Sequence, residues 1–373
     1  MFKFKIGPIM LFIVSVFFIG LASRYNKATE LIYTNVINRF FREKLSLIFD
    51  KISVPVGDIV TVVIIIFILL AIINFIKNIV RPKKWITYIY RLFWGSVNVI
   101  CVSMFIYVLL AGLNYHIPDL STSLIEKYNH KYSTEVKVNA DNAKRVEVYK
   151  YIESKAVETK ELLNTNSDAG DSDNSSWDIR DISAQISQGY SIISDQFPIL
   201  GGHYCLPKYS IKSPVFNIMG LDARYYMLTN EVSVSNELPS LYQPFILGKY
   251  MAYQRGVVKE DEAEFYSYLA LINSPDQKLR YSAYISMLES LSEGLKVTDK
   301  IEYNRLMSSQ SHAIKKDIEI IRAYKASYGM GKDFKDLYNY TFRRVNGDVR
   351  VEPVNSQVAY ILATYYSLSP YQN

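Results

Sequence analysis

Long apolar runs dominate the first 118 residues, whereas the rest of the chain alternates polar residues with periodic apolar ones. Three runs, at about 6–23, 59–76 and 92–115, contain no charged residue. A helix of roughly 20 residues crosses the hydrocarbon core of a bilayer, and lipid offers the backbone no other hydrogen-bond partner. The pattern therefore predicts a membrane domain over residues 1–118 with three transmembrane helices.

The first run has an alternative interpretation as a cleaved signal peptide. Lys3 and Lys5 give it a basic start, and Gly20-Leu21-Ala22 is a weak cleavage site. Two later spans already anchor the chain, which favours a retained first span.

Residues 28–50, between the first two runs, repeat apolar positions at helical spacing. Examples are Ile32, Val36, Phe40 and Ile48. Such amphipathicity is typical of a helix that lies along a membrane surface, so we expect an interfacial helix here.

Basic residues crowd the connection between the second and third runs, including Lys77, Arg81 and Lys84. The positive-inside rule places this connection and the N-terminus in the cytoplasm, and the domain after the third span outside the cell. Arg39, Arg42 and other basic residues of the first connection oppose this orientation. The formal charge is +9 over residues 1–115 and −3 over the remainder. The basic balance thus belongs to the membrane flanks, and no nucleic-acid surface is predicted.

Residues 119–373 combine helical periodicity with a few strand-like segments. The predicted elements are helices at 119–163 and 177–194, strands at 213–216, 223–228 and 231–235, and a turn at 229–230. From 241 onward the chain is predicted to be mostly helical, apart from loops near 273–275, 329–332 and 346–353. A polar stretch at 164–176 predicts a flexible loop. This pattern indicates an α+β fold.

One helical hairpin carries the most informative residues. Pro244 suits a first helical turn, Gly256 suits a helix end, and acidic residues open the next helix at Glu260. Lys249 and Tyr253 are four residues apart and share one helix face. Taken alone, these features describe a hairpin whose acidic start is solvated.

Beyond this hairpin, the motifs extend across residues 215–290. Lys249–Gly256, then Glu260-Asp261-Glu262-Ala263-Glu264-Phe265, then Arg280–Tyr284 resemble an uncharacterised family of bacterial membrane proteins with a gluzincin-type, zincin-like metallopeptidase domain. Its members show His-Glu-x-Ala-His-Gln-Arg-Gly, then Glu-Asp-Glu-Ala-Asn-Phe, then Arg-Tyr-Ser-x-Tyr. In that pattern two histidines and a later glutamate bind zinc, and the glutamate after the first histidine is the general base.

The resemblance implies a degenerate metal site here. Lys249 and Tyr253 stand at the histidine positions, Tyr250 stands at the base, and only Glu262, at the third-ligand position, keeps a competent side chain. A protonated amine cannot bind zinc, and without zinc or base no water is activated. We therefore expect no catalytic residue, metal or other cofactor, although zinc is expected in active relatives. We also expect Lys249 to pair with Glu262 as an internal replacement for the lost cation.

The leading hypothesis is a membrane-anchored, catalytically inactive metallopeptidase homologue that binds a peptide or protein partner at the cell surface. The predicted cleft consists of Val232, Val234, Lys249, Tyr253, Glu262 and Tyr281, with Glu231–Ser235 as an edge strand open to strand addition. The alternatives are an active membrane metallopeptidase with non-standard ligands and a structural membrane assembly factor.

Overall fold

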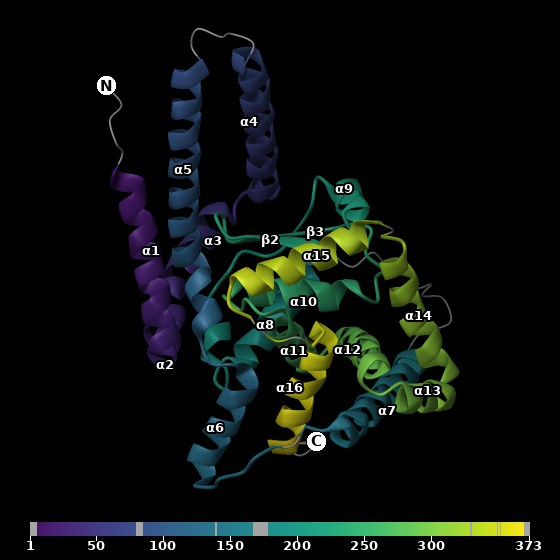
Figure 1. Cartoon of the computed structure of the whole chain (residues 1–373). Coiled ribbons are helices and arrows are strands. Elements are labelled where there is room, and N and C mark those ends of the chain that lie inside the picture. The colour runs from purple at the N-terminus through teal and green to yellow at the C-terminus, as the bar shows by residue number, and fades with distance from the viewer. Residues whose placement is uncertain are drawn as a thin grey trace.

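A computed structural model gives the fold of the chain. It describes residues 6–79, 85–138, 140–166, 178–328, 330–348, 350 and 352–368. The described chain is mostly helical with one small three-stranded sheet (Figure 1). The predicted combination of many helices with a small sheet is thereby confirmed.

Three helices are long and apolar enough to cross a membrane. They are α1 (Ile6–Arg24), α4 (Val56–Ile79) and α5 (Trp85–Leu110). Most of their large apolar side chains are exposed, as expected for surfaces that meet lipid. α1 packs against α5, whereas α4 is hardly buried (Figure 1). The three predicted spans thus form helices, and the chain is that of a membrane protein.

Between α1 and α4 the chain is helical, as predicted for residues 28–50. The segments are α2 (Asn26–Ala28), a π-helix η1 (Thr29–Asn38) and α3 (Arg39–Phe49). Their apolar side chains, such as Ile32, Phe40 and Ile48, are exposed. The opposite face is buried although it is polar, and we call it the polar stripe: Thr29, Thr34, Asn38, Arg42 and Ser46. The first two members are five residues apart, which suits the i→i+5 bonding of a π-helix.

The polar stripe joins the end of α5 to the C-terminal domain. Asn38 donates hydrogen bonds to the carbonyl oxygens of Leu109 and Leu110 at 3.2 and 3.0 Å. These carbonyls lack helical partners because α5 ends there. Asn114, in the 3-10 helix η2 (Gly112–His116), donates to Asn38 Oδ1 at 3.2 Å and to the Gly256 carbonyl at 2.9 Å. One buried network therefore connects a span with the domain that follows it.

The C-terminal domain, residues 120–368, contains the remaining elements. They are α6 (Leu120–Tyr132), α7 (Asn142–Asn166), α8 (Ile179–Ile193), η3 (Pro198–Leu200), β1 (Lys208–Tyr209), α9 (Ser213–Ile218), β2 (Ala223–Tyr226), β3 (Glu231–Val234), α10 (Gln243–Gln254), α11 (Glu260–Ile272), α12 (Gln277–Thr298), α13 (Lys300–Ser309), α14 (His312–Ala326), α15 (Met330–Val345) and α16 (Val354–Leu368). α11 lies at the centre of the core and packs against α8, α10, α12 and α16.

The predicted hairpin of α10 and α11 forms as expected. Pro244 occupies the first turn of α10. Gly256 follows the helix with φ +94°, a conformation that side chains disfavour. A Cβ atom at Gly256 would also lie 1.6 Å from the buried guanidinium of Arg42. Glycine is therefore required both for the turn and for the contact with the polar stripe.

Two of the predicted elements are wrong. The segment predicted as a strand at 213–216 is instead the short helix α9, because Ser213 and Phe216, three residues apart, are buried while Val215 is exposed. The single helix predicted at 119–163 is two helices, since Ser133 adopts a left-handed conformation (φ 52°) and ends α6. Residues 164–166 of the predicted loop at 164–176 belong to α7. The rest of that loop lies outside the described residues.

The sheet has the order β1-β3-β2, with β3 parallel to β1 and antiparallel to β2. β3 is therefore the central strand, and its four residues are buried. The prediction of Glu231–Ser235 as an open edge strand is wrong. β1 and β2 are the two edge strands instead.

The N-terminal end of α4 is fixed to this sheet. The carboxylate of Glu231, on β3, accepts hydrogen bonds from the amides of Val56 and Gly57 at 3.2 and 3.0 Å, which satisfies unpaired donors at the start of α4. Glu231 also pairs with Lys208 at 2.7 Å. Asp58 in the same turn is fully buried and accepts a hydrogen bond from Ser210 Oγ at 2.7 Å.

Candidate functional site

A cavity of about 500 Å³ lies between α10, β2, α15 and the end of α5. α15 crosses over β2 and α10 and forms one wall (Figure 1). Seven aromatic rings of the described chain line part of the cavity: Tyr107, Tyr115, Tyr225, Tyr250, Tyr253, Tyr338 and Phe342. Three of the residues at the degenerate motif, Lys249, Tyr250 and Tyr253, come together in its wall.

Lys249 reaches from α10 to the first turns of α11. Its Nζ atom lies 2.6 Å from Glu260 Oε1 and 2.9 Å from Glu264 Oε1. Burial alone would lower the pKa of Lys249, but the two carboxylates outweigh burial and hold the pKa well above its ordinary value. The amine therefore stays protonated, and a protonated amine has no lone pair for a metal ion.

The predicted pair of Lys249 with Glu262 is wrong. Glu260 and Glu264 are four residues apart and share one face of α11, whereas Glu262, two residues from each, faces away from it. Glu262 instead accepts a hydrogen bond from the amide of Leu120 at 3.1 Å and lies 3.4 Å from Lys259 Nζ. The carboxylates that face the motif are those of Glu260 and Glu264.

Tyr250 and Tyr253 pack their rings edge to face, with centroids 5.3 Å apart. Burial raises the pKa of Tyr250 to about 12 and that of Tyr253 well above its ordinary value. Both phenols are therefore protonated at neutral pH. Among the described residues neither hydroxyl group has a hydrogen-bond partner, so both can donate to a molecule in the cavity.

Charged groups from α15 close the cavity opposite α10. Lys335 lies 3.3 Å from Asp222, the residue before β2, and Tyr328 also donates to Asp222. Arg343 Nε lies 2.9 Å from Asp348 Oδ2. The contact with Asp222 fixes α15 against the edge of the sheet, and the pair of Arg343 with Asp348 fixes α15 to the loop that follows it.

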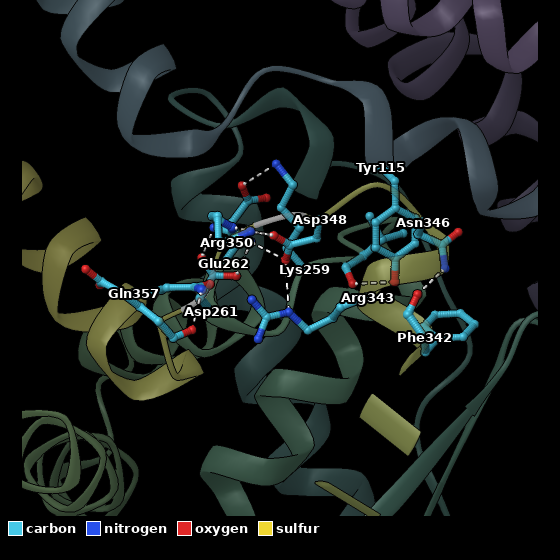
Figure 2. A network of polar contacts seen from close by, with 12 residues as sticks. Tyr115, Lys259, Asp261, Glu262, Phe342, Arg343, Asn346, Asp348, Arg350 and Gln357 are labelled. Atoms are coloured by element: carbon cyan, nitrogen blue, oxygen red, sulfur yellow. Dashed lines mark hydrogen bonds and ion pairs between the residues drawn. The ribbon is translucent and has the colours of Figure 1, made fainter. Parts of the chain in front are cut away.

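Figure 2 shows a network of polar contacts that includes Asp348, Arg343 and Lys259 of the cavity wall. Arg350 contacts Asp348 at 2.9 Å and Asp261 at 2.7 Å. Burial opposes ionisation of Asp348, but hydrogen bonds from Arg350 and Arg343 hold its pKa well below the usual range. Lys259 then pairs with Asp119 at 2.5 Å, ahead of α6. The network connects the α15–α16 loop to α11 and α6 and so supports the wall of the cavity.

The other residues of the predicted cleft lie elsewhere. Val232 and Val234 are fully buried in the central strand. Glu262 lines a second cavity of about 550 Å³ between α6, α11 and α16. Tyr281, on α12, is buried and donates to Asp317 at 2.5 Å. Of the six predicted residues, Lys249 and Tyr253 line the cavity.

The helix at α15 and the strand at β2 were both predicted, but their position as walls of this cavity was not. Leu337, Tyr338, Phe342 and Val345 recur at helical spacing on α15. No local pattern shows what such a helix covers. Within the described ranges, no three His, Cys, Asp or Glu side chains come together as ligands for a metal ion.

Comparison with known proteins places the chain in a family. The family described as "Protein of unknown function (DUF3810)" matches residues 33–350, so the chain belongs to it. No curated protein and no solved structure matches the chain. The family's description names no activity, so the zinc-peptidase ancestry stays a prediction.

Proposed function

We propose that this membrane protein binds an extended peptide segment of a partner in the cavity between β2, α10 and α15, and that it does not hydrolyse the peptide. The observation that carries the proposal is the state of the motif residues. Lys249 is held between two carboxylates, and the hydroxyl groups of Tyr250 and Tyr253 are unpaired toward the cavity among the described residues. Such a wall can donate hydrogen bonds but cannot activate water.

The resemblance to a zincin-like, gluzincin-type domain supports a peptide as the ligand. In such domains an edge strand beside the metal helix holds substrate by strand addition. Here β2 is the edge strand that borders the cavity, since Ala223, Arg224 and Tyr225 line it beside α10, whereas β1 is the edge strand on the other side of β3. A peptide that pairs with β2 would place alternate side chains against the rings of Tyr250 and Tyr253. The volume lies within the usual range of ligand pockets, about 300–1,000 Å³.

Loss of catalysis follows from the same residues. A peptidase of this kind needs a metal ion to lower the pKa of its water and a base to take the proton. The ammonium of Lys249 repels a second cation, and the phenol of Tyr250 stays protonated. We therefore propose an inactive peptidase homologue. The positive-inside rule supports an extracytoplasmic position for the domain.

Peptide binding can be measured with the full chain in lipid nanodiscs and a library of fluorescein-labelled hexapeptides, followed by anisotropy. We expect a subset of peptides to bind, and Tyr250→Ala and Tyr253→Ala to weaken binding at least tenfold. Tyr132→Ala, at an exposed site on α6, is the matched control. Methylation of two peptide amides that pair with β2 should cost about 2 kcal/mol, or roughly 30-fold. Binding that is equal in all variants would refute this site.

Catalysis and metal binding need a separate experiment. The purified full chain should carry no stoichiometric zinc and leave the bound peptides intact in mass spectrometry. The variant Lys249→His, Tyr250→Glu, Tyr253→His should take up zinc because it restores the ligands and base of the related motif. Peptide cleavage by the parent chain that a chelator abolishes would establish the active-peptidase alternative. A parent chain that binds no peptide, and whose partners bind through the spans, would establish the assembly-factor alternative.

A further inference from the structure

The loop before α9 and α9 itself expose an unusual run of apolar side chains. Ile211, Val215, Ile218 and Met219 are 57, 47, 75 and 36% exposed. Pro214 is exposed as well, and Lys212 is only partly buried. Among the described side chains from 211 to 219, every exposed one is apolar. We call Ile211, Val215, Ile218 and Met219 the α9 patch.

The α9 patch lies at the lower end of the span α4. The amide of Ile211 donates to Asp58 Oδ2 at 3.1 Å, and Lys212 Nζ lies 3.5 Å from Asp58 Oδ1. Asp58 is in the first turn of α4, and the candidate span begins at Val56. Figure 1 shows α9 at the level of this end of α4. The patch is therefore placed where the span leaves the bilayer.

The length of α4 sets this level more closely. Its span has 23 residues, which at 1.5 Å each gives about 35 Å, against a hydrocarbon core of roughly 30 Å. The excess of about 5 Å is one helical turn. The uncharged run of α4 begins only after Asp58, which places the turn that carries Asp58 at the level of the lipid headgroups, and the α9 patch lies beside it.

We propose that the α9 patch is a membrane-contact surface and that bilayer lipid covers it. Lipid is favoured over a protein partner because the patch is continuous with the span α4: Ile211 and Lys212 both contact Asp58 in the first turn of that helix. The end of α3 also lies near the start of α4, because Lys208 donates to the Phe49 carbonyl at 2.8 Å and pairs with Glu231, which accepts from the amides of Val56 and Gly57. The exposed apolar face of η1 and α3 continues from there. Lys212 and the exposed Arg224 next to the patch suit phosphate headgroups.

The contact holds the C-terminal domain against the bilayer at a second place besides the spans. Met219 of the patch and Arg224 also line the cavity. The cavity therefore opens close to the membrane surface. This inference does not depend on the ligand of the cavity, because it concerns the α9 patch alone.

A fluorescent probe at residue 218 tests the proposal in the full chain. Ile218→Cys is labelled with an environment-sensitive dye and placed in nanodiscs of phosphatidylcholine and phosphatidylglycerol. The parent chain, treated with the same dye, gives the background signal, which should be low because Cys101 and Cys205 are buried. Ile301→Cys on α13, 83% exposed, is the matched control. We expect spin-labelled lipid acyl chains to quench the probe at 218 at least twice as strongly as the probe at 301, and iodide to show the reverse order.

Two results would overturn the proposal. Equal quenching of both probes by iodide would mean that the patch faces water. Shielding of position 218 from iodide without quenching by lipid would mean that protein, such as a second copy of the chain, covers it. If Ile218→Cys does not fold by circular dichroism, Val215→Cys on the same helix carries the test.

Discussion

Removal of the Lys249 ammonium should strongly destabilise the hairpin of α10 and α11. In Lys249→Met the carboxylates of Glu260 and Glu264, with side chains 23 and 11% exposed, lose their shared cation. Breaking a buried ion pair from one side costs about 3–5 kcal/mol, and the partial exposure of Glu260 favours the lower end, about 3 kcal/mol. Urea unfolding of the full chain in detergent, followed by near-ultraviolet circular dichroism, measures the loss. Lys296→Met, in a largely exposed pair with Glu293, should cost below about 0.5 kcal/mol.

The pH dependence of this loss gives a second check. In the parent chain burial opposes ionisation of Glu260, but Lys249 holds its pKa below the ordinary value of about 4.3. Its stabilisation is therefore present above that value and is lost as the pH falls through the folded-state pKa. The raised pKa of Lys249 adds stability below its ordinary pKa, about 10.4, which is lost at higher pH. In Lys249→Met, burial raises the pKa of Glu260 against the weaker opposing effects of Lys335 and Arg343. Protonation then relieves the penalty, and the difference from the parent should shrink between pH 7 and pH 5. A difference below 1 kcal/mol that does not change with pH would refute this reasoning.

Three further substitutions test other contacts by the same unfolding assay. Gly256→Ala should cost about 2–3 kcal/mol, because φ is +94° and a Cβ atom would meet Arg42, whereas Gly95→Ala on α5 has open space and should cost little. Glu231→Gln should cost about 3 kcal/mol by leaving Lys208 buried without its carboxylate. The exposed Glu161→Gln is its control, and an equal effect of the two substitutions would contradict the role of Glu231 at the N-terminal end of α4. Tyr253→Phe should change stability by less than about 0.5 kcal/mol, since its hydroxyl has no partner in the described part of the chain, yet it should weaken peptide binding about fivefold; a large loss of stability would show that the hydroxyl has a structural partner.

Local sequence signals predicted the elements that local physics determines. The three spans follow from uninterrupted apolar runs, and the α10–α11 hairpin follows from Pro244 and Gly256. Helical spacing could also have predicted the partners of Lys249, because Glu260 and Glu264 share one face of α11 and Glu262 lies on another. The resemblance to a ligand pattern drew attention to Glu262 instead.

Other features depend on contacts distant in the sequence. β3 is central only because β1, two residues long and too short for a periodic pattern, pairs with it. Val215 and Phe216 are β-branched and aromatic residues of the kind that favours strands, yet the segment is helical, and Val215 is exposed where α9 lies beside the first turn of α4. The placement of α15 over the cavity follows from single contacts such as Lys335 with Asp222. No propensity or period encodes such contacts.

The polar stripe has a consequence for how this protein can be divided. If the chain were cut after η2, Gly256 would lose Asn114 as a partner, Asn230 would lose Arg42 and Ser46, and Glu231 would lose the amides of α4. A water-soluble fragment would thus carry several polar groups without hydrogen-bond partners on the surface that contacts the N-terminal helices in the full chain. The N-terminal helices therefore complete the hydrogen bonding of the C-terminal domain, and truncation would remove these partners together with the membrane anchor.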